Sequence, residues 1–496
     1  MTLPATVPHT AARDSFFKLA LAIGVLVVGL EVGYLLYSPL PYDPVGYLVG
    51  RDFVNTWVGG ELALTREPQA HFAVDAYNAL LAEKFGGRYP LHIWSYPPHF
   101  LLFTWPLSLM PYMTAYVLYC VAGMLLYLVV VADGQRRVDH LVVLLALAPA
   151  VTVNIWCGQN GFWTTALLVG GLIQLDRRPA LAGVLFGVLS IKPQMGVLLP
   201  LMLVLTARWR TTLFAVMTVA ILLALATLAF GASVWTAYLH DAMPVQTSVF
   251  LRDYENFMTH MPTAFMNARV AGLSLPVAAC LQAVLSLASI TAVVWTFRRS
   301  RDADLSNALL VTATFVATPY AFNYDMVAFG WVIVKLMDRT DNNAWDFALM
   351  LAVWATPFAT VALGIAGLPI SVLPMLGMGA RLLWRIANLQ SHPRPQLQKT
   401  LLAAIHRSRL NPAKGTKVPT PSPAALSAPT RAERMDRHRP VDRMACGERL
   451  PGVSPSRHAR ESFPALASPA RRDIQSRACL RPTHPWSRRH EHARRS

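Results

Sequence analysis

The chain has 496 residues, of which 54% are apolar and only 14% are charged. Soluble chains are about a quarter charged, so a soluble fold of this size could not bury so much apolar surface. The net charge of +17 is concentrated in residues 391–496, which hold 22 of the 44 Lys and Arg residues but 7 of the 27 Asp and Glu residues. The apolar composition predicts a polytopic membrane protein. Because the rest of the chain is nearly neutral, we expect no nucleic-acid partner.

Apolar runs recur along the first 390 residues. They cover residues 16–37, 113–132, 139–156, 161–175, 180–191, 194–207, 211–231, 274–296, 304–319, 326–337, 344–364 and 369–388. The first run is long enough to cross a ~30 Å hydrocarbon core and is not a cleavable signal peptide. Several others are shorter than the ~20 residues of a perpendicular span. The pattern predicts an all-α integral membrane bundle in which some helices are tilted or broken.

Basic residues fall in every second short connection between these runs. They are Arg136, Arg137, Arg177, Arg178, Arg208, Arg210, Arg298, Arg299, Arg301 and Arg339. The positive-inside rule places such residues in the cytoplasm, which predicts about 12 crossings of the cell (inner) membrane with both termini cytoplasmic. Residues 98–110, which prolines bound on both sides, are then a re-entrant or interfacial segment.

Two long loops lie outside the membrane in this topology, at residues 38–97 and 232–273. The first contains a stretch with helical periodicity, residues 73–85, in which Val74, Tyr77, Leu80 and Leu81 share one face. This helix either lies along the membrane surface or packs on the bundle. The sequence leaves both alternatives open.

The expected division of the chain is a cytoplasmic N-terminus (residues 1–15), a membrane domain (16–390) and a basic cytoplasmic tail (391–496). The tail holds 14 of the 36 prolines and has almost no apolar runs. It cannot bury a core, so we expect it to be disordered. A basic tail either attracts anionic lipid or has no selected role.

Polar motifs interrupt the apolar pattern at five places, all of them on the outer face in this topology. They are residues 51–57, 94–99, 158–161, 192–194 and 319–325. Each motif has a structural explanation, because Pro-Pro and Gly-Gln-Asn-Gly form turns and a lysine can extend to the interface. Their convergence on one side favours a functional site, since a polar residue at a membrane is by default a candidate for function.

Several segments resemble family 87 glycosyltransferases, membrane enzymes of the GT-C type. The longest is GQNGFWTTALLVGGLIQLDRRPALAGVLFGVLSIKPQMGVLLPLMLVLTARWR, and the others are DFVNTWVGGELAL, SYPPHFLLFTWPLSLMPY and PYAFNYDM. The resemblance covers roughly residues 15–388, so the tail is a departure from the family pattern. It implies a GT-C-like bundle that transfers a sugar, typically mannose, from a polyprenyl-phosphate donor with inversion on the extracytoplasmic face. The acceptor is then a glycolipid or glycan within reach of membrane lipid.

The family places an essential acidic residue in the first outer loop, and Asp52 is the matching position. An acceptor hydroxyl is a weak nucleophile, so a carboxylate must take its proton. The departing phosphate gains negative charge, which a nearby cation stabilises. Lys192 is the first candidate for that cation, with Arg252 and Arg269 in reserve. The residues expected to orient sugar hydroxyls or shape the cavity are Tyr96, Gln159, Asn160, Tyr320 and Asp325.

The sequence predicts no definite cofactor and gives weak support for a divalent metal. The single Asp-x-Asp motif, Asp302-Ala303-Asp304, resembles the metal-nucleotide motif of soluble glycosyltransferases. It follows Arg298, Arg299 and Arg301, on the cytoplasmic side by the charge rule. We therefore interpret it as a solvated helix start.

Two other classes of function compete with the transferase. A transporter or flippase also has broken helices and polar groups at the membrane midplane, but it predicts an inverted repeat and short loops, and the first outer loop is long. A non-catalytic scaffold is the third class. The presence of Asp52, Gln159 and Lys192 argues against it.

Overall fold

The computed structural model describes residues 9–65, 67–86, 92–132, 142–252, 259–337 and 339–391. All of them belong to the first of two compact units, residues 1–407. The tail predicted to be disordered lies outside the described residues, except for its first residue. Throughout the described part of the chain the regular elements are helices, and no strand occurs.

The first half of this unit contains, in chain order, α1 (His9–Leu36), α2 (Phe53–Ala63), η1 (Pro68–His71), α3 (Val74–Phe85), η2 (Pro98–Phe100), α4 (Leu101–Ser108), α5 (Tyr112–Val131), η3 (Val142–Ala146), α7 (Pro149–Cys157), α8 (Gly161–Gln174), α9 (Pro179–Val188), η4 (Leu189–Ile191), η5 (Pro193–Gly196) and α10 (Leu199–Leu205). The second half contains α11 (Trp209–Phe230), α12 (Ser233–Ala237), η6 (Tyr238–Ala242), α13 (Met243–Arg252), α14 (Ala264–Val270), α15 (Leu275–Arg299), α16 (Ala303–Ala317), η8 (Asn323–Val327), α17 (Ala328–Met337), α18 (Ala344–Ile365) and α19 (Leu373–Ser391).

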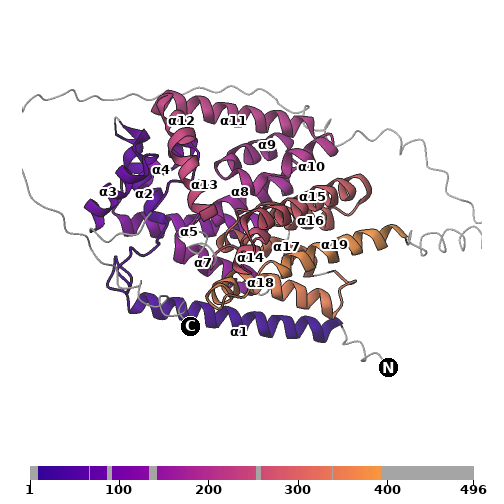
Figure 1. Cartoon of the computed structure of the whole chain (residues 1–496). Helices are drawn as coiled ribbons and strands as arrows, with labels where there is room; N and C mark the ends of the chain where they lie inside the picture. The colour runs from indigo at the N-terminus through magenta and orange to yellow at the C-terminus, as the bar shows by residue number, and fades with distance from the viewer. Residues whose placement is uncertain are drawn as a thin grey trace, which may run out of the picture. The chain divides into compact units, whose positions relative to one another are not determined.

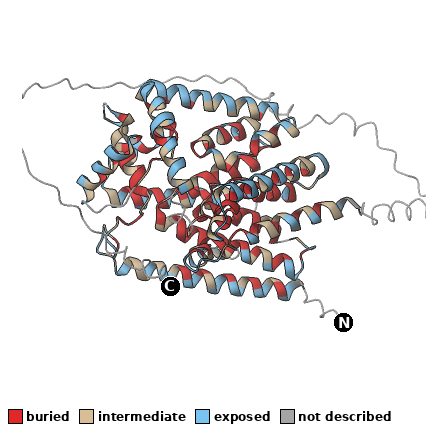
Figure 2. Ribbon diagram, viewed as in Figure 1, coloured by how far each residue is buried: buried red, intermediate tan, exposed pale blue. Residues whose placement is uncertain are grey.

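Five helices of the described part are long and apolar enough to cross a membrane: α1, α5, α11, α15 and α18. The outward faces of α1 and α11 are exposed (Figure 2) and carry large apolar side chains such as Val25 and Leu228. Water does not stabilise such surfaces, whereas lipid does. The predicted class, an all-α membrane protein, is confirmed. The count of about 12 crossings stays a prediction.

The interior is formed by shorter helices. Most residues of α8, α16 and α17 are buried, and each of these helices has fewer than the ~20 residues of a full span. Helix ends and chain breaks are tolerated at membrane depth only where protein surrounds them, because lipid cannot satisfy backbone N–H and C=O groups. The breaks beside these buried helices can therefore carry polar residues.

The first loop folds against the bundle through α2 and α3. These two helices and α4 gather at one end of the unit, while α1 begins and α19 ends at the other (Figure 1). The predicted helix at residues 73–85 is confirmed as α3. Its buried residues Tyr77 and Leu81 pack with Val54 and Val58 of α2. These contacts favour packing on the bundle over an isolated position on the membrane surface.

The segment at residues 98–110 forms η2 and α4, which together span 11 residues. At 1.5 Å per residue this is about half of the hydrocarbon thickness, so the segment is too short to cross on its own. It packs on α2, where a Cβ at Gly60 would come within 2.3 Å of the Thr104 carbonyl oxygen.

The Asp-x-Asp motif starts a helix, as predicted. The Asp302 side chain accepts a hydrogen bond from the Leu305 N–H at the N-terminus of α16. Its second carboxylate oxygen is 2.8 Å from Arg339. Capping and this ion pair account for Asp302, and the Asp304 side chain is about half exposed (52%).

Candidate active site

The turn between α7 and α8 is the Gly-Gln-Asn-Gly motif, and its two glycines allow close packing. Gly158 ends α7 in the left-handed region at φ 61°, and a Cβ there would come within 2.5 Å of Phe53. A Cβ at Gly161 would come within 2.4 Å of the Tyr324 carbonyl oxygen. The glycines therefore bring the start of α2 and the η8 segment against one turn, with Gln159 and Asn160 between them.

Asp52 lies directly before α2 and is fixed by its backbone to this turn. Its N–H donates a hydrogen bond to the Cys157 carbonyl oxygen at 3.0 Å. Asp52 occupies the N-cap position, but its side chain makes no capping hydrogen bond. The half-buried carboxylate instead accepts a hydrogen bond from Gln159 Nε2 at 2.9 Å. Its position leaves it available to a ligand.

A second hydrogen bond fixes the Gln159 amide. The Tyr96 hydroxyl donates to Gln159 Oε1 at 2.7 Å. Since a side-chain amide has one acceptor and one donor end, this bond orients the NH₂ group toward Asp52. Tyr96, Gln159 and Asp52 thus form one chain of hydrogen bonds, which comes from three separate parts of the sequence.

Lys192 and Asp325 form a buried ion pair beside this chain. The distance between Lys192 Nζ and Asp325 Oδ1 is 2.5 Å, and the two residues are 3% and 1% exposed. Lys192 also donates to Asn160 Oδ1 at 3.0 Å and lies over the Tyr324 ring. Asp325 accepts a further bond from the Phe322 N–H. The pair therefore ties the α7–α8 turn, the η4–η5 break and the η8 segment together.

Tyr320 lies at the edge of the same group. Its hydroxyl lies near the side chains of Ser95 and Gln246, and its ring meets the Phe250 ring at a centroid distance of 5.5 Å. Gln246 and Phe250 belong to α13, so this helix of the second long loop reaches the site. Sequence patterns gave no signal for Gln246, because it has no partner in its neighbourhood along the chain.

The structure brings together six of the sequence-predicted residues through direct hydrogen bonds or ion pairs. They are Asp52, Tyr96, Gln159, Asn160, Lys192 and Asp325. The hydrogen bonds and ion pairs that join these six residues do not include Arg252 or Arg269. Arg252 is exposed at the end of α13, and Arg269 donates to the Leu273 carbonyl oxygen at 2.7 Å.

Arg51 is a residue that the sequence analysis did not assign to the site. Its backbone has φ 26°, in the left-handed region that is strained for a side chain with a Cβ. Its guanidinium is 2.7 Å from the buried Asp43 carboxylate and lies over the Tyr47 and Trp156 rings. These contacts hold the strained residue next to Asp52.

Asp43 is the centre of this arrangement. Burial opposes its ionisation, but hydrogen bonds from Tyr34 and from backbone N–H groups, together with Arg51, outweigh burial and lower the pKa of Asp43 below its usual value. The carboxylate accepts from the Tyr34 hydroxyl at 2.7 Å and from the Val45 and Tyr47 N–H groups. Asp43 is therefore a structural carboxylate.

Two histidines also approach the site. Burial lowers the pKa of His260, while the Asp52 charge acts in the opposite direction. The His260 carbonyl oxygen accepts a hydrogen bond from the Asn323 N–H at 2.7 Å. His99 is buried, 3.1 Å from Ser190, and stacks on Trp235. Among the described residues, no group of three or more His, Cys, Asp or Glu side chains could hold a metal ion.

The fold and the site define a class of protein: an all-α membrane protein with a carboxylate, amides and phenols gathered where buried helices break. The family model for glycosyltransferase family 87 matches residues 94–319. This match, over somewhat less than half of the chain, is consistent with the family predicted from the sequence motifs and indicates a membrane glycosyltransferase. Tyr96, Gln159 and Lys192 lie inside the matched region, whereas Asp52 and Asp325 lie outside it. No curated protein and no solved structure matches the chain.

Proposed function

We propose that this glycosyltransferase uses a polyprenyl-phosphate sugar, with mannose the first candidate, and that Asp52 is its catalytic base. The supporting observation is that the Asp52 carboxylate makes no capping bond and is oriented by Gln159, which Tyr96 orients in turn. A base must be fixed within hydrogen-bond reach of the proton it takes. The acceptor is a glycolipid or glycan.

The step is an inverting displacement. Asp52 takes the proton of the acceptor hydroxyl as the acceptor oxygen forms a bond to C1 of the sugar. The bond between C1 and the phosphate oxygen breaks, and its electron pair leaves with the polyprenyl phosphate. Attack and departure occur on opposite faces of C1, so the anomeric configuration inverts. Holding both reactants in this geometry supplies much of the rate enhancement.

The departing phosphate needs a cation. The ion pair between Lys192 and Asp325 favours Arg252 or Arg269 over Lys192 for this role. Asp325 neutralises Lys192, and releasing Lys192 would leave an unpaired carboxylate in a buried site, which is costly. Arg252 is exposed and can reach an incoming phosphate. Within the proposal, Lys192 and Asp325 shape the cavity, together with Asn160 and Tyr320, and Arg252 or Arg269 binds the phosphate.

The proposal includes sidedness: the enzyme lies in the cell (inner) membrane with both termini cytoplasmic and the site outside. The charge pattern supports this orientation. A polyprenyl-phosphate donor supports it too, because a lipid carrier presents its sugar at the membrane surface, where Asp52 and α2 would meet the acceptor.

The experiment is transfer in membranes that contain the full chain, supplied with synthetic polyprenyl-phosphate mannose and a glycolipid extract as acceptor. Asp52→Asn preserves shape and removes the charge, so turnover at saturating donor should fall about 10²- to 10⁴-fold. Asp75→Asn is the matched control, since Asp75 is an exposed residue of the same loop, and it should keep wild-type turnover. Wild-type turnover of Asp52→Asn would exclude Asp52 as the base.

A further inference from the structure

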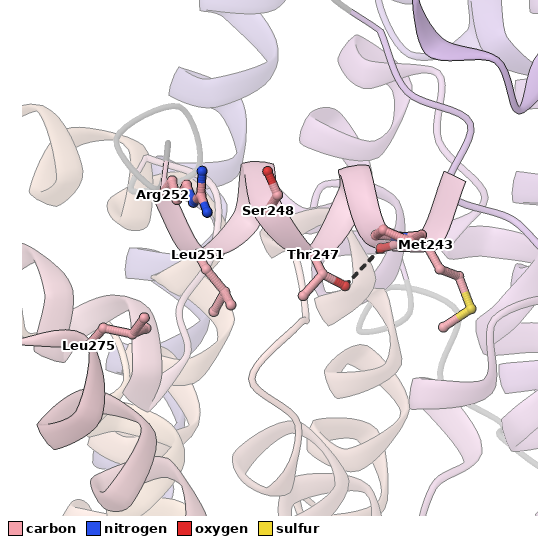
Figure 3. Close-up of a pocket in the computed structure, with 7 residues that line it drawn as sticks. Met243, Thr247, Ser248, Leu251, Arg252 and Leu275 are labelled. Carbon is pink, nitrogen blue, oxygen red and sulfur yellow. Dashed lines mark hydrogen bonds between the residues drawn. The ribbon is translucent and has the colours of Figure 1, made fainter. Parts of the chain in front are cut away.

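A groove runs between α13 and the start of α15 (Figure 3). Its volume is about 570 Å³, within the ~300–1,000 Å³ typical of ligand pockets. The side chains that line it include Met243, Thr247, Ser248, Leu251, Arg252 and Leu275. The groove is a shallow, open surface, so an occupant would lie along it.

The lining is divided into two stripes along α13. Residues four apart lie on the same face of a helix. Met243, Thr247 and Leu251 form the first stripe, which faces Leu275, while Ser248 and Arg252 form the second (Figure 3). The groove thus offers an apolar side next to a cation and a hydroxyl, which suits a ligand with an apolar chain and an anionic end.

The groove adjoins the candidate active site through α13. On another face of this helix, Gln246 lies near the Tyr320 hydroxyl, and the Phe250 ring packs edge-on against Tyr320. Since Phe250 and Leu251 are neighbours in the chain, a molecule held against Leu251 and Arg252 lies one helix width from Tyr320. The groove and the site therefore lie on two faces of the same helix.

The groove lies at one end of a candidate membrane-spanning helix. Leu275 is the first residue of α15, which is one of the five helices in the described part of the chain that are long and apolar enough to cross a membrane. Leu239, Met243 and Leu273 expose 53%, 41% and 39% of their surface. Exposed apolar side chains with an arginine beside them suit the level at which lipid chains meet phosphate headgroups.

We propose that this groove binds the lipid end of the polyprenyl-phosphate donor, with Arg252 and Ser248 on the phosphate and Met243, Leu251 and Leu275 on the first isoprene units. This inference rests on the proposed function and specifies where its donor binds. Charge complementarity supports the phosphate contact, because a guanidinium donates two parallel bonds to phosphate oxygens. Because Phe250 of the same helix packs against Tyr320, a phosphate at Arg252 would hold the attached sugar near the site.

The test is photolabelling of the full chain in phosphatidylcholine nanodiscs. The probe is a polyprenyl phosphate with a diazirine on its first isoprene unit, used without sugar or acceptor. Label should map to residues 243–252 and to Leu275. Undecaprenyl phosphate should compete, whereas undecaprenol and phosphatidylglycerol should not. Equal competition by phosphatidylglycerol would show a general phospholipid surface and overturn the proposal.

Arg252→Gln should lower labelling about 10-fold or more, the value of a charge-assisted hydrogen bond, and Ser248→Ala should lower it less. Arg210→Gln is the matched control, because Arg210 is an exposed arginine on α11, and it should label like wild type. Unchanged labelling of Arg252→Gln, or label confined to other helices, would overturn the proposal.

Transfer activity separates the two proposals. Asp52-dependent transfer from polyprenyl-phosphate mannose without label in the groove would refute the donor groove alone. Label in the groove that undecaprenyl phosphate displaces, together with no transfer from any polyprenyl-phosphate sugar, would refute the proposed function and leave the groove as a lipid-phosphate site.

Discussion

Gln159 donates a hydrogen bond to the Asp52 carboxylate at 2.9 Å, although the two residues are 107 positions apart in the chain. The contact depends on the backbone bond from Asp52 N–H to Cys157 and on the close approach that Gly158 allows. The candidate base is therefore positioned by the turn between α7 and α8, outside its own loop.

The first prediction concerns the orientation of Asp52. Gln159→Leu keeps the size of the side chain but removes both hydrogen bonds, so Asp52 loses its orienting partner. Misplacement of a reacting group by about 1 Å can cost 10²-fold, and we expect turnover to fall by about 10- to 100-fold with a smaller change in KM. Tyr96→Phe removes only the outer bond and should cost less. Equal or larger loss in Tyr96→Phe would show that Tyr96 acts directly on substrate.

The second prediction concerns the ion pair of Lys192 and Asp325. Lys192→Met leaves a buried carboxylate unpaired, which typically costs about 3–5 kcal/mol, so the melting temperature in detergent should fall clearly. Combining it with Asp325→Leu removes both charges and should restore much of the loss. If Lys192 instead binds the donor phosphate, the single variant should melt near wild type and lose donor affinity, and the double variant should not recover.

The third prediction concerns pH and Asp43. The folded pKa of Asp43 lies below its usual value, so the charged form stabilises the fold above the unfolded pKa of about 4. That stability is lost as the pH falls through the folded pKa. Asp43→Asn should cost about 1–3 kcal/mol at neutral pH, and its melting temperature should approach that of wild type below pH ~4. A gap that stays constant down to pH ~3 would contradict this role.

The fourth prediction tests sidedness by cysteine labelling. Thr65 is exposed after α2, and Ser300 directly follows α15. In a background with Cys280, Cys446 and Cys479 replaced by serine, Thr65→Cys should react with an impermeant thiol reagent in intact spheroplasts. Ser300→Cys should react only after the membrane is opened. The reverse pattern would invert the topology and place Asp52 in the cytoplasm.

The fifth prediction is that the tail is dispensable. A chain that ends at Ser391 keeps all of α19 and removes the segment with 14 prolines, a composition from which we expect no packed core. It should insert normally and keep transfer activity, measured per molecule of inserted protein. Normal insertion with lost activity would reveal a function of the tail.

The sequence by itself determined the positions of apolar helices and the class of protein. Apolar runs coincide with helices such as α8 and α16 because helix formation in a membrane depends on local composition and backbone hydrogen bonding. Local chemistry also sufficed for the Asp302 cap and for the Gly158 turn, since each interaction joins residues a few positions apart. The family resemblance was predictable for the same reason: its motifs are contiguous.

Only the tertiary structure decided the partners of the polar residues. Lys192 is 133 positions from Asp325, and nothing in either neighbourhood specifies that the two neutralise each other. The apolar pattern predicts which face of a helix is buried but not which helix covers it. The Arg51–Asp43 pair and the groove along α13 are also unpredictable from sequence. Both arise where loops without periodicity pack against the bundle, so their contacts depend on the assembled helices.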